Sequence, residues 1–478
     1  MNKPISTSGE SLEHGRSIVF RNGIVLTMDD ARRVIKNCDV LVVGGEIKEI
    51  GPNIQAPADA LSIDASGGII MPGMIDTHRH MWQTAMRAYG ADWTLSQYFV
   101  WYYLEHGKNF RPQDVYAGNL LSAIEAVDAG VTTSVDWSHG LQTIDHADAA
   151  VDALEEIDGR FVLAYGNIQS APWEWTADKG FQDFYSRRFD GKDRLGFQIA
   201  FDVVAGPEFP ERAAFDVARD LGVSVNTHAG VLGANGDDSI RLMHENGYMT
   251  PDTILVHCAT LSDDSYQRIA ACGSSVSVST ESEQSAGQGY PSSWKLRQFG
   301  IPITLSHDTS VWWSADLFTA MRTTLGADRS RQHFEAHLKG ETVTQLDVRS
   351  DDVIEWATRG GSRALGLDSK IGSLEVGKRA DIVLVKNDES PVMFPIVNPY
   401  GHIAMQAQRA DVHTVVIDGN IVKHEHRLIN IDLAKARSAV DETVSFLETT
   451  LGEEAWDAGM HPDLPPKHEI DNPYHYNK

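Results

Sequence analysis

The chain has 478 residues, enough for a barrel of about 250 residues and a second, smaller module. Its 42% hydrophobic and 23% charged residues are typical of a globular protein and exclude fibrous and disordered classes. The formal net charge of -26 would repel a phosphate backbone. We therefore expect no nucleic-acid partner.

Membrane attachment and disulfide bonding are also disfavoured. No apolar run reaches the length of about 20 residues needed to cross a bilayer, and residues 1–17 contain no apolar signal core. We expect a cytoplasmic protein without membrane contact. Cys38, Cys258 and Cys272 lie far apart and form no Cys-x-x-Cys pair, which favours reduced thiols. A metal site in this chain must therefore use histidine and carboxylate ligands.

The first segments of the chain are strand-like. Residues 17–30 and 39–52 contain short β-rich stretches with Asn-Gly and Gly-Gly turn signals. We interpret residues 1–66 as the first part of a small β module.

From about residue 67 the pattern changes to apolar strands that alternate with amphipathic helices, which is typical of a parallel sheet. The predicted strands are residues 68–76, 132–137, 160–166, 196–203, 223–228, 253–258, 274–279 and 302–308. The predicted helices between them include residues 114–130, 212–222, 263–273 and 314–326, each ending in glycine as helix C-termini often do. Eight strands close a barrel, so residues 67–368 are predicted to form a (β/α)8 TIM barrel.

After a predicted helix at 351–367, the sequence is again strand-like at 370–388 and 411–429. Each β block alone is too short to bury a core, so we expect residues 369–430 to join residues 1–66 in one small β-sandwich. Residues 431–478 are predicted to form a C-terminal helix and an extended tail that covers a neighbouring subunit of a homo-oligomer.

The strongest local motif is His78-x-His80 at the end of the first barrel strand. Residues two apart on a strand face the same side, so both imidazoles would project into the barrel mouth and could clamp a metal. A lone His-x-His pair is often merely solvent-facing. The position at a strand end of a predicted barrel favours ligands, because barrel active sites lie there.

Three further polar residues end predicted strands: His228, His257 and Asp308. Each alone would more often be structural, but the set converges if the barrel closes. Three nitrogens and one carboxylate oxygen suit zinc, with Fe(II), Co and Mn as alternatives, and leave a position for a water molecule. Such a water can be acidified to a pKa near ~7.

These motifs resemble the triazine hydrolase and cytosine deaminase branch of the amidohydrolase superfamily. The resemblance runs from MPGMIDTHRHM through GVTTSVDW to the closing segments IGSLEVGKRADIVLV and DVHTVVIDGNIV. The metal ligands that it implies are His78, His80, His228 and Asp308. It also implies that His257 contacts the metal-bound water or the substrate and that Gln83 contacts the substrate.

One position departs from that branch. Its deaminases usually carry a glutamate three residues after the strand-five histidine, and this chain has Val231 there. Glu281 and Glu283 could supply a carboxylate from the loop after strand seven, or could be solvated loop charges. No lysine that could be carbamylated ends strand four, which favours one metal ion over two.

Aromatic residues near the predicted mouth suggest a pocket for an apolar or aromatic small-molecule substrate. They are Trp82, Trp93, Trp137, Trp312 and Trp313. The candidate substrate contacts are Gln83, Trp82, Trp137, His139, Glu281, Glu283 and Trp312. By strand alternation His307 should point away from Asp308, which fits a supporting role.

Because Val231 removes the usual ring-protonating acid, we expect hydrolysis of an amide, carbamate or urea-type C–N bond, as in the similar molinate and phenylurea hydrolases. Asp308 would take the proton of the attacking water, and His257 would polarise the electrophilic carbon. The alternative is an aminohydrolase of a nitrogen heterocycle with Glu281 or Glu283 as the acid. A catalytically silent ligand-binding barrel is a third hypothesis, disfavoured because all four ligand positions are filled.

Overall fold

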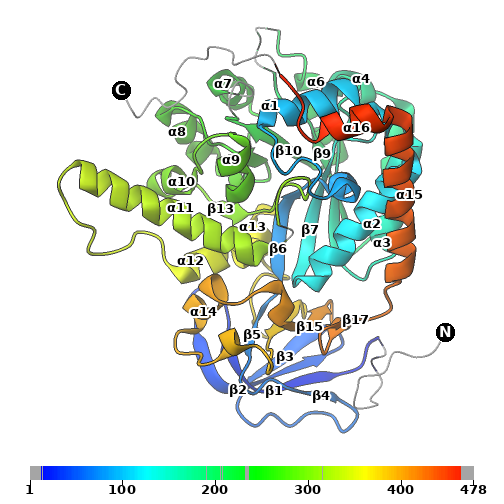
Figure 1. The fold of residues 1–478 in the computed structure, drawn as a ribbon. Coiled ribbons are helices and arrows are strands. Elements are labelled where there is room, and N and C mark those ends of the chain that lie inside the picture. Colours follow the sequence, from blue (N-terminus) through cyan, green and yellow to red (C-terminus); the bar gives the residue numbers. More distant parts are fainter. Residues whose placement is uncertain are drawn as a thin grey trace.

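The computed structural model describes residues 12, 14–189, 191–204, 206, 208–231, 236–314 and 316–464. Figure 1 shows a barrel of strands surrounded by helices and, at one end of it, a separate small sheet built from both ends of the chain. The predicted fold class is confirmed. No described helix is long and apolar enough to span a bilayer.

Eight parallel strands form the barrel, each paired with the next along the chain. They are β6 (Met74–Arg79), β7 (Val131–Ser138), β8 (Arg160–Tyr165), β9 (Leu195–Ala200), β10 (Ser224–Ala229), β11 (Ile254–His257), β12 (Ser275–Val278) and β13 (Ile303–Leu305). The first and last strands meet through an isolated parallel bridge between Arg79 and Asp308. The sheet is thus nearly closed, and the carboxyl ends of its strands face a common mouth.

Helices surround this barrel, and two of the predicted helix ends coincide with the observed ones. Gly222 and Gly273, with φ of 67° and 72°, follow the last residues of α6 and α8 in the left-handed conformation that glycine adopts most easily. The predicted end at Gly326 is wrong, because α11 continues to Leu338.

The described helices up to the end of the barrel are, in chain order, η1 (Met81–Met86), α1 (Leu95–Tyr98), η2 (Phe99–Glu105), η3 (Gly107–Asn109), α2 (Pro112–Asp128), α3 (Ile144–Glu155), α4 (Pro172–Trp175), α5 (Lys179–Phe189), α6 (Arg212–Leu221), α7 (Asp237–Glu245), α8 (Asp263–Cys272), α9 (Thr280–Ala286), α10 (Ser293–Phe299), α11 (Leu317–Leu338), α12 (Ser350–Glu355), η4 (Trp356–Gly360) and α13 (Gly361–Ala364). Those that follow are η5 (Pro391–Met393), α14 (Pro399–Met405), η6 (Arg409–Asp411), α15 (Leu433–Leu451) and α16 (Glu453–Gly459).

The small sheet combines the two β blocks, as predicted. Its strands are β1 (Ile18–Leu26), β2 (Val34–Val43), β3 (Glu46–Gly51), β4 (Leu61–Asp64), β5 (Ile69–Pro72), β14 (Ile382–Val385), β15 (Val412–Ile417), β16 (Asn420–His424) and β17 (Arg427–Leu428). The predicted first barrel strand, 68–76, divides at Gly73. The part before Gly73 is β5, which pairs with β14 and β1, and the part after it begins the barrel. A Cβ at Gly73 would lie 2.1 Å from Thr132 Oγ1, so only glycine fits this passage.

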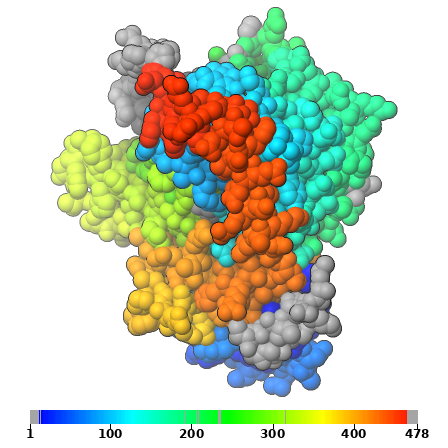
Figure 2. Space-filling view, turned by 45° about the vertical axis from the view of Figure 1, so that its right-hand side comes forward, coloured from blue at the N-terminus to red at the C-terminus, as the bar shows by residue number. Residues whose placement is uncertain are grey.

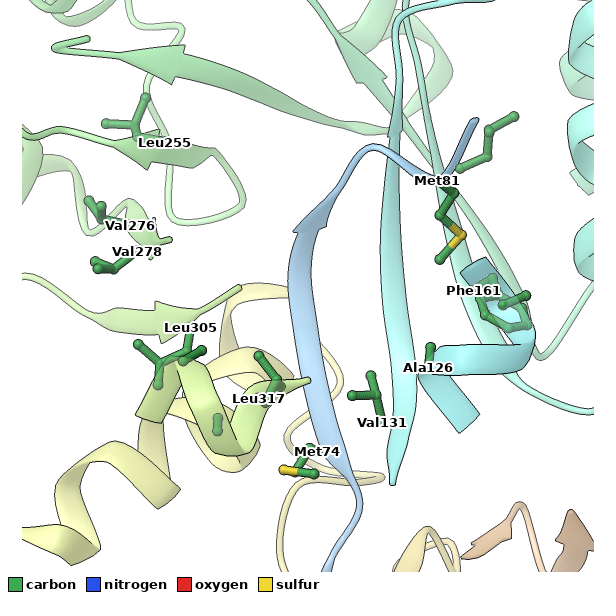
Figure 3. Packing of buried hydrophobic residues seen from close by; sticks show 14 of the residues in the cluster. Met74, Met81, Ala126, Val131, Phe161, Leu255, Val276, Val278, Leu305 and Leu317 are labelled. Carbon is green, nitrogen blue, oxygen red and sulfur yellow. The ribbon is translucent and has the colours of Figure 1, made fainter. Parts of the chain in front are cut away.

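Ion pairs join the small sheet to the barrel. Arg160, at the start of β8, contacts Asp381, next to β14, at 3.3 Å, and both side chains are buried. Lys423 on β16 contacts the carboxylate of Asp128 at the end of α2 at 2.9 Å. Alternate strand residues belong to a large apolar cluster, and Figure 3 shows its members Val276, Val278 and Leu305 on the neighbouring strands β12 and β13.

The C-terminal helices lie along the outside of the barrel. Figure 2 shows this segment running over the surface from the small sheet to the opposite end of the molecule. There, Tyr89 donates a hydrogen bond to the carbonyl of Trp456, Trp93 to that of Gly459, and Gln97 to that of Pro462. The predicted tail lies largely outside the described residues, from residue 465 onward.

Candidate active site

Five side chains from four different strand ends converge at the barrel mouth. His78 lies on β6, His80 follows that strand, and His228 lies on β10. His257 ends β11, and Asp308 follows β13. In two overlapping groups, His78 with His80 and His228 and His78 with His257 and Asp308, one donor atom of each residue lies within 4.8 Å of the others. Closure of the barrel therefore brings together residues up to 230 positions apart in the sequence.

Contacts at the far nitrogens orient the rings of His80 and His228. The Nδ1 of His80 donates to the carbonyl of Trp137 at 2.8 Å, because a carbonyl oxygen can only accept. The Nδ1 of His228 lies 2.9 Å from Asp202 Oδ1. Both contacts place the proton on Nδ1 and leave a lone pair on Nε2, as carboxylate and carbonyl partners do for metal-ligating histidines.

The donor atoms fit a single divalent ion. The Nε2 atoms of His78 and His228 lie 3.3 Å apart, and Asp308 Oδ1 lies 3.3 Å from Nε2 of both His78 and His80. Tetrahedral bonds of about 2.1 Å would place ligand atoms about 3.4 Å apart. Lone pairs at this separation repel one another unless a cation lies between them. The donor set thus has the spacing and the chemistry of a metal centre.

Burial keeps the imidazoles of His78 and His80 neutral. It lowers the pKa of His78 well below its usual value and that of His80 to about 4. For Asp308, burial opposes ionisation, but the contacts with His78, His80 and His257 lower its pKa well below the usual range. Neutral imidazoles and one carboxylate are the protonation states that bind a divalent metal.

Two of the five residues have a left-handed backbone. His257 has φ of 69° and Asp308 φ of 71°, conformations that cost free energy for residues with a Cβ. Hydrogen bonds hold both in place. Ser292 Oγ donates to the carbonyl of His257 at 2.6 Å, and Asp308 exchanges backbone hydrogen bonds with His78 and His80 at 3.0 and 2.8 Å.

A cavity of about 160 Å³ opens above these residues. Its described lining is His80, Leu95, Tyr98, Phe99, Tyr103, Asp202, Val204, His228, Val231, His257, Gln288, Asp308 and Trp312. Val231 therefore occupies the cavity wall with an apolar side chain. Gln288 donates from Nε2 to Asp308 Oδ2 at 3.3 Å and fixes the outer face of that carboxylate.

Several predicted substrate contacts lie behind this wall. Gln83 donates to Tyr98 OH at 2.8 Å and accepts from Thr309 at 2.8 Å, so both ends of its amide are engaged. The Nε2 of His139 lies 3.2 Å from the same Tyr98 hydroxyl. Trp82 is buried against Tyr102, Phe110 and His139. These residues support the wall instead of forming it.

Trp137 lies beneath the histidines. Its ring centroid is 4.3 Å from that of His228, and its indole N–H donates to Asn226 at 3.1 Å. Of the predicted tryptophans, Trp312 alone is in the described lining. Trp93 instead contacts the C-terminal segment, and Trp313 is partly buried. His307 points away from Asp308 and accepts from Arg79 Nε at 3.1 Å, as alternation predicts.

The two glutamates of α9 have separate surroundings. Glu283 is fully buried, and its Oε1 lies 3.2 Å from His257 Nδ1 and accepts from the N–H of Ser279 at 2.8 Å. Burial raises the pKa of Glu283. Glu281 accepts from Ser314 Oγ at 2.8 Å, and burial raises its pKa to about 8. Neither is a solvated loop charge, and only Glu283 contacts a residue of the cavity.

The sequence interpretation missed Asp202, Gln288 and the aromatic residues of α1 and η2. Asp202 had a usable signal, because it follows β9 at the strand end where barrel active-site residues lie. Gln288 lies in a loop with no comparable signal. Tyr98, Phe99 and Tyr103 belong to an aromatic run whose orientation depends on packing.

Comparison with known proteins gives consistent matches over most of the chain. The protein-family model described as Amidohydrolase family matches residues 69–422. A 5'-deoxyadenosine deaminase of Methanosarcina acetivorans is 28% identical over 450 residues, which cover 90% of this chain and 98% of the relative. A 5-methylthioadenosine/S-adenosylhomocysteine deaminase of Symbiobacterium thermophilum is 29% identical over 426 residues, covering 85% and 93%. The structure of a triazine hydrolase from Arthrobacter aurescens has a TM-score of 0.77 at 20% identity, covering 90% of this chain and 99% of that one.

Proposed function

We propose that this chain, which belongs to the amidohydrolase family, is a metal-dependent aminohydrolase that releases ammonia from an amino-substituted nitrogen heterocycle. The observation that carries this proposal is the convergence of His78, His80, His228 and Asp308 beneath a cavity with aromatic walls. The sequence alone favoured cleavage at a carbonyl carbon. The two curated relatives are named as deaminases of adenine nucleosides, and they support the alternative.

The metal would be held by His78, His80, His228 and Asp308. Its nitrogen-rich donor set favours zinc, with Fe(II), Co and Mn as alternatives. When bound, such an ion supplies an acidified water molecule and polarises the electrophilic carbon. The C–O bond then forms and the C–N bond breaks, so one water is consumed for each ammonia released.

Side chains of the protein carry out the proton transfers. Asp308 receives the proton of the attacking water, because it supplies the one carboxylate among the five converging residues. His257 lines the cavity, and its Nδ1 faces Glu283. The opposite edge of the ring is then free to deliver a proton to the heterocycle or to the leaving nitrogen. Glu283 acts through His257 and replaces the glutamate that related deaminases carry where this chain has Val231.

Val231 also favours a second candidate function. An apolar wall beside the attacking water suits hydrolysis of an amide, carbamate or urea-type bond, because only the leaving amine then needs a proton. The two candidates differ in product, since the first yields free ammonia from a ring carbon and the second yields an acid and an amine.

The test is to load the purified protein with zinc and measure ammonia release from aminated purines, pyrimidines and triazines, with amides, carbamates and phenylureas in parallel. We expect ammonia from a member of the first group and none after chelation. His78→Ala serves as the control for the site and should lose both metal and turnover. Hydrolysis of a member of the second group, without ammonia from any member of the first, would establish the second candidate instead.

A further inference from the structure

The outer wall of the cavity is a continuous aromatic surface. Trp312 and Tyr98 have ring centroids 4.8 Å apart, Tyr98 and Phe99 5.9 Å, and Phe99 and Tyr103 4.9 Å. All four residues line the cavity. Aromatic faces carry negative partial charge and attract cations, so such a wall distinguishes a positively charged ring from a neutral one.

The charged side chains of the described lining have one sign. Asp202 stands at its edge, with 27% of its side chain exposed, and Asp308 lies at its base. No lysine or arginine is among the described lining residues. Asp202 uses Oδ1 to accept from His228, which fixes the carboxylate in place while the side chain still borders the cavity.

We propose that the substrate of this site carries a positive charge, an ammonium or amidinium group on or beside a planar ring, which Asp202 and the aromatic wall bind. The inference rests on the proposed function for the location of the site and specifies its substrate class. A divalent ion would repel a cation, but Asp308 and Asp202 bring two carboxylates to the same small cavity and counter that charge. An anionic substrate would find no cationic side chain in this lining. The net charge of -26 also attracts cations to the molecule.

The test compares two probes of nearly equal shape on the metal-loaded protein at pH 7: benzylamine, which is protonated, and benzyl alcohol, which is neutral. Calorimetric titration should show benzylamine binding at least tenfold more tightly. Asp202→Asn keeps the hydrogen bond to His228 but removes the charge, and it should abolish this preference. Asp252→Asn makes the same charge change at an exposed position and should retain it. Metal content is measured for each protein.

Equal affinities for the two probes, no binding of benzylamine, or an unchanged preference in metal-loaded Asp202→Asn would overturn the proposal. If Asp202→Asn loses its metal, Phe99→Leu decides, because it removes an aromatic face without touching the metal ligands. We expect it to weaken benzylamine binding more than benzyl alcohol binding, and an equal effect on both would also overturn the proposal. These tests measure binding, not turnover. A failed ammonia-release test would therefore leave this proposal standing, and a failed binding test would leave the proposed function standing.

Discussion

Glu281 and Glu283 are two residues apart on α9, but only Glu283 contacts the site. The carboxylate of Glu283 faces the ring of His257, whereas Glu281 accepts hydrogen bonds from Ser314. The sequence offered both as the replacement acid. The geometry separates them, because a proton can pass between the cavity and Glu283 through His257 but has no such described route to Glu281.

Glu283→Gln should therefore lower kcat by about 100-fold, the usual cost of removing a proton-transfer partner, with little change in KM. Glutamine keeps the volume and can still accept from Ser279, so the backbone there should remain in place. Glu281→Gln, the matched control, should stay within a few-fold of the wild type. Steady-state kinetics of both variants with the best substrate decide this. A large loss in Glu281→Gln with an active Glu283→Gln would reverse the assignment.

Residues at strand ends were predictable, and residues of the cavity wall were not. His78, His228, His257 and Asp308 each end or follow an apolar strand, so barrel geometry alone indicates that they converge. Tyr98 is oriented by contacts with Gln83, His139 and Trp312, which are distant in the sequence. Its neighbours Trp93 and Gln97 contact Gly459 and Pro462. Local periodicity carries no information about such contacts.

At the scale of elements, glycines also divide into positions that the sequence predicts and positions that it does not. Gly222 and Gly273 end helices, as expected, but Gly326 lies inside α11 and Gly118 inside α2. The presence of a glycine does not by itself distinguish a helix end from a position where another backbone segment lies very close. At Gly118 the backbone of Trp82 lies so near that an added Cβ would be 2.2 Å from its carbonyl oxygen, whereas at Gly326 nothing lies within 4 Å.

The same substitution should therefore have opposite effects in the two helices. Gly326→Ala should raise the free energy of unfolding by about 0.5–1 kcal/mol, because alanine loses less backbone entropy in a helix. Gly118→Ala should lower it by about 1–3 kcal/mol, because α2 must move away from η1. Urea unfolding of both variants measures the difference. Stabilisation by both substitutions would show that α2 and η1 move apart without a cost in the free energy of unfolding.

At the scale of the whole molecule, the barrel has a weak seam. β13 has only three residues, and the backbone pairing described between this edge and β6 is one bridge, between Arg79 and Asp308. Side-chain hydrogen bonds of Thr77 to Thr304 and to the carbonyl of Leu305 supplement it. The proposed ligands lie on both sides of this seam, with His78 and His80 on one side and Asp308 on the other, and His228 joins them from across the barrel. A metal ion held by this set would tie the ends of the sheet together.

Removal of the metal should therefore lower the melting temperature of the entire barrel. An ion that binds only the folded state adds about 2.7 kcal/mol at 100 times its Kd. With an unfolding entropy of about 2.1 cal/mol/K per residue, a chain of 478 residues should then melt about 3 °C higher than the chelated protein. Calorimetry with zinc or with chelator measures this shift. His228→Ala should remove it, whereas His333→Ala, an exposed histidine on α11, should preserve it. A zinc-dependent shift that persists in His228→Ala but disappears in His333→Ala would place the stabilising ion on the surface instead of at the seam.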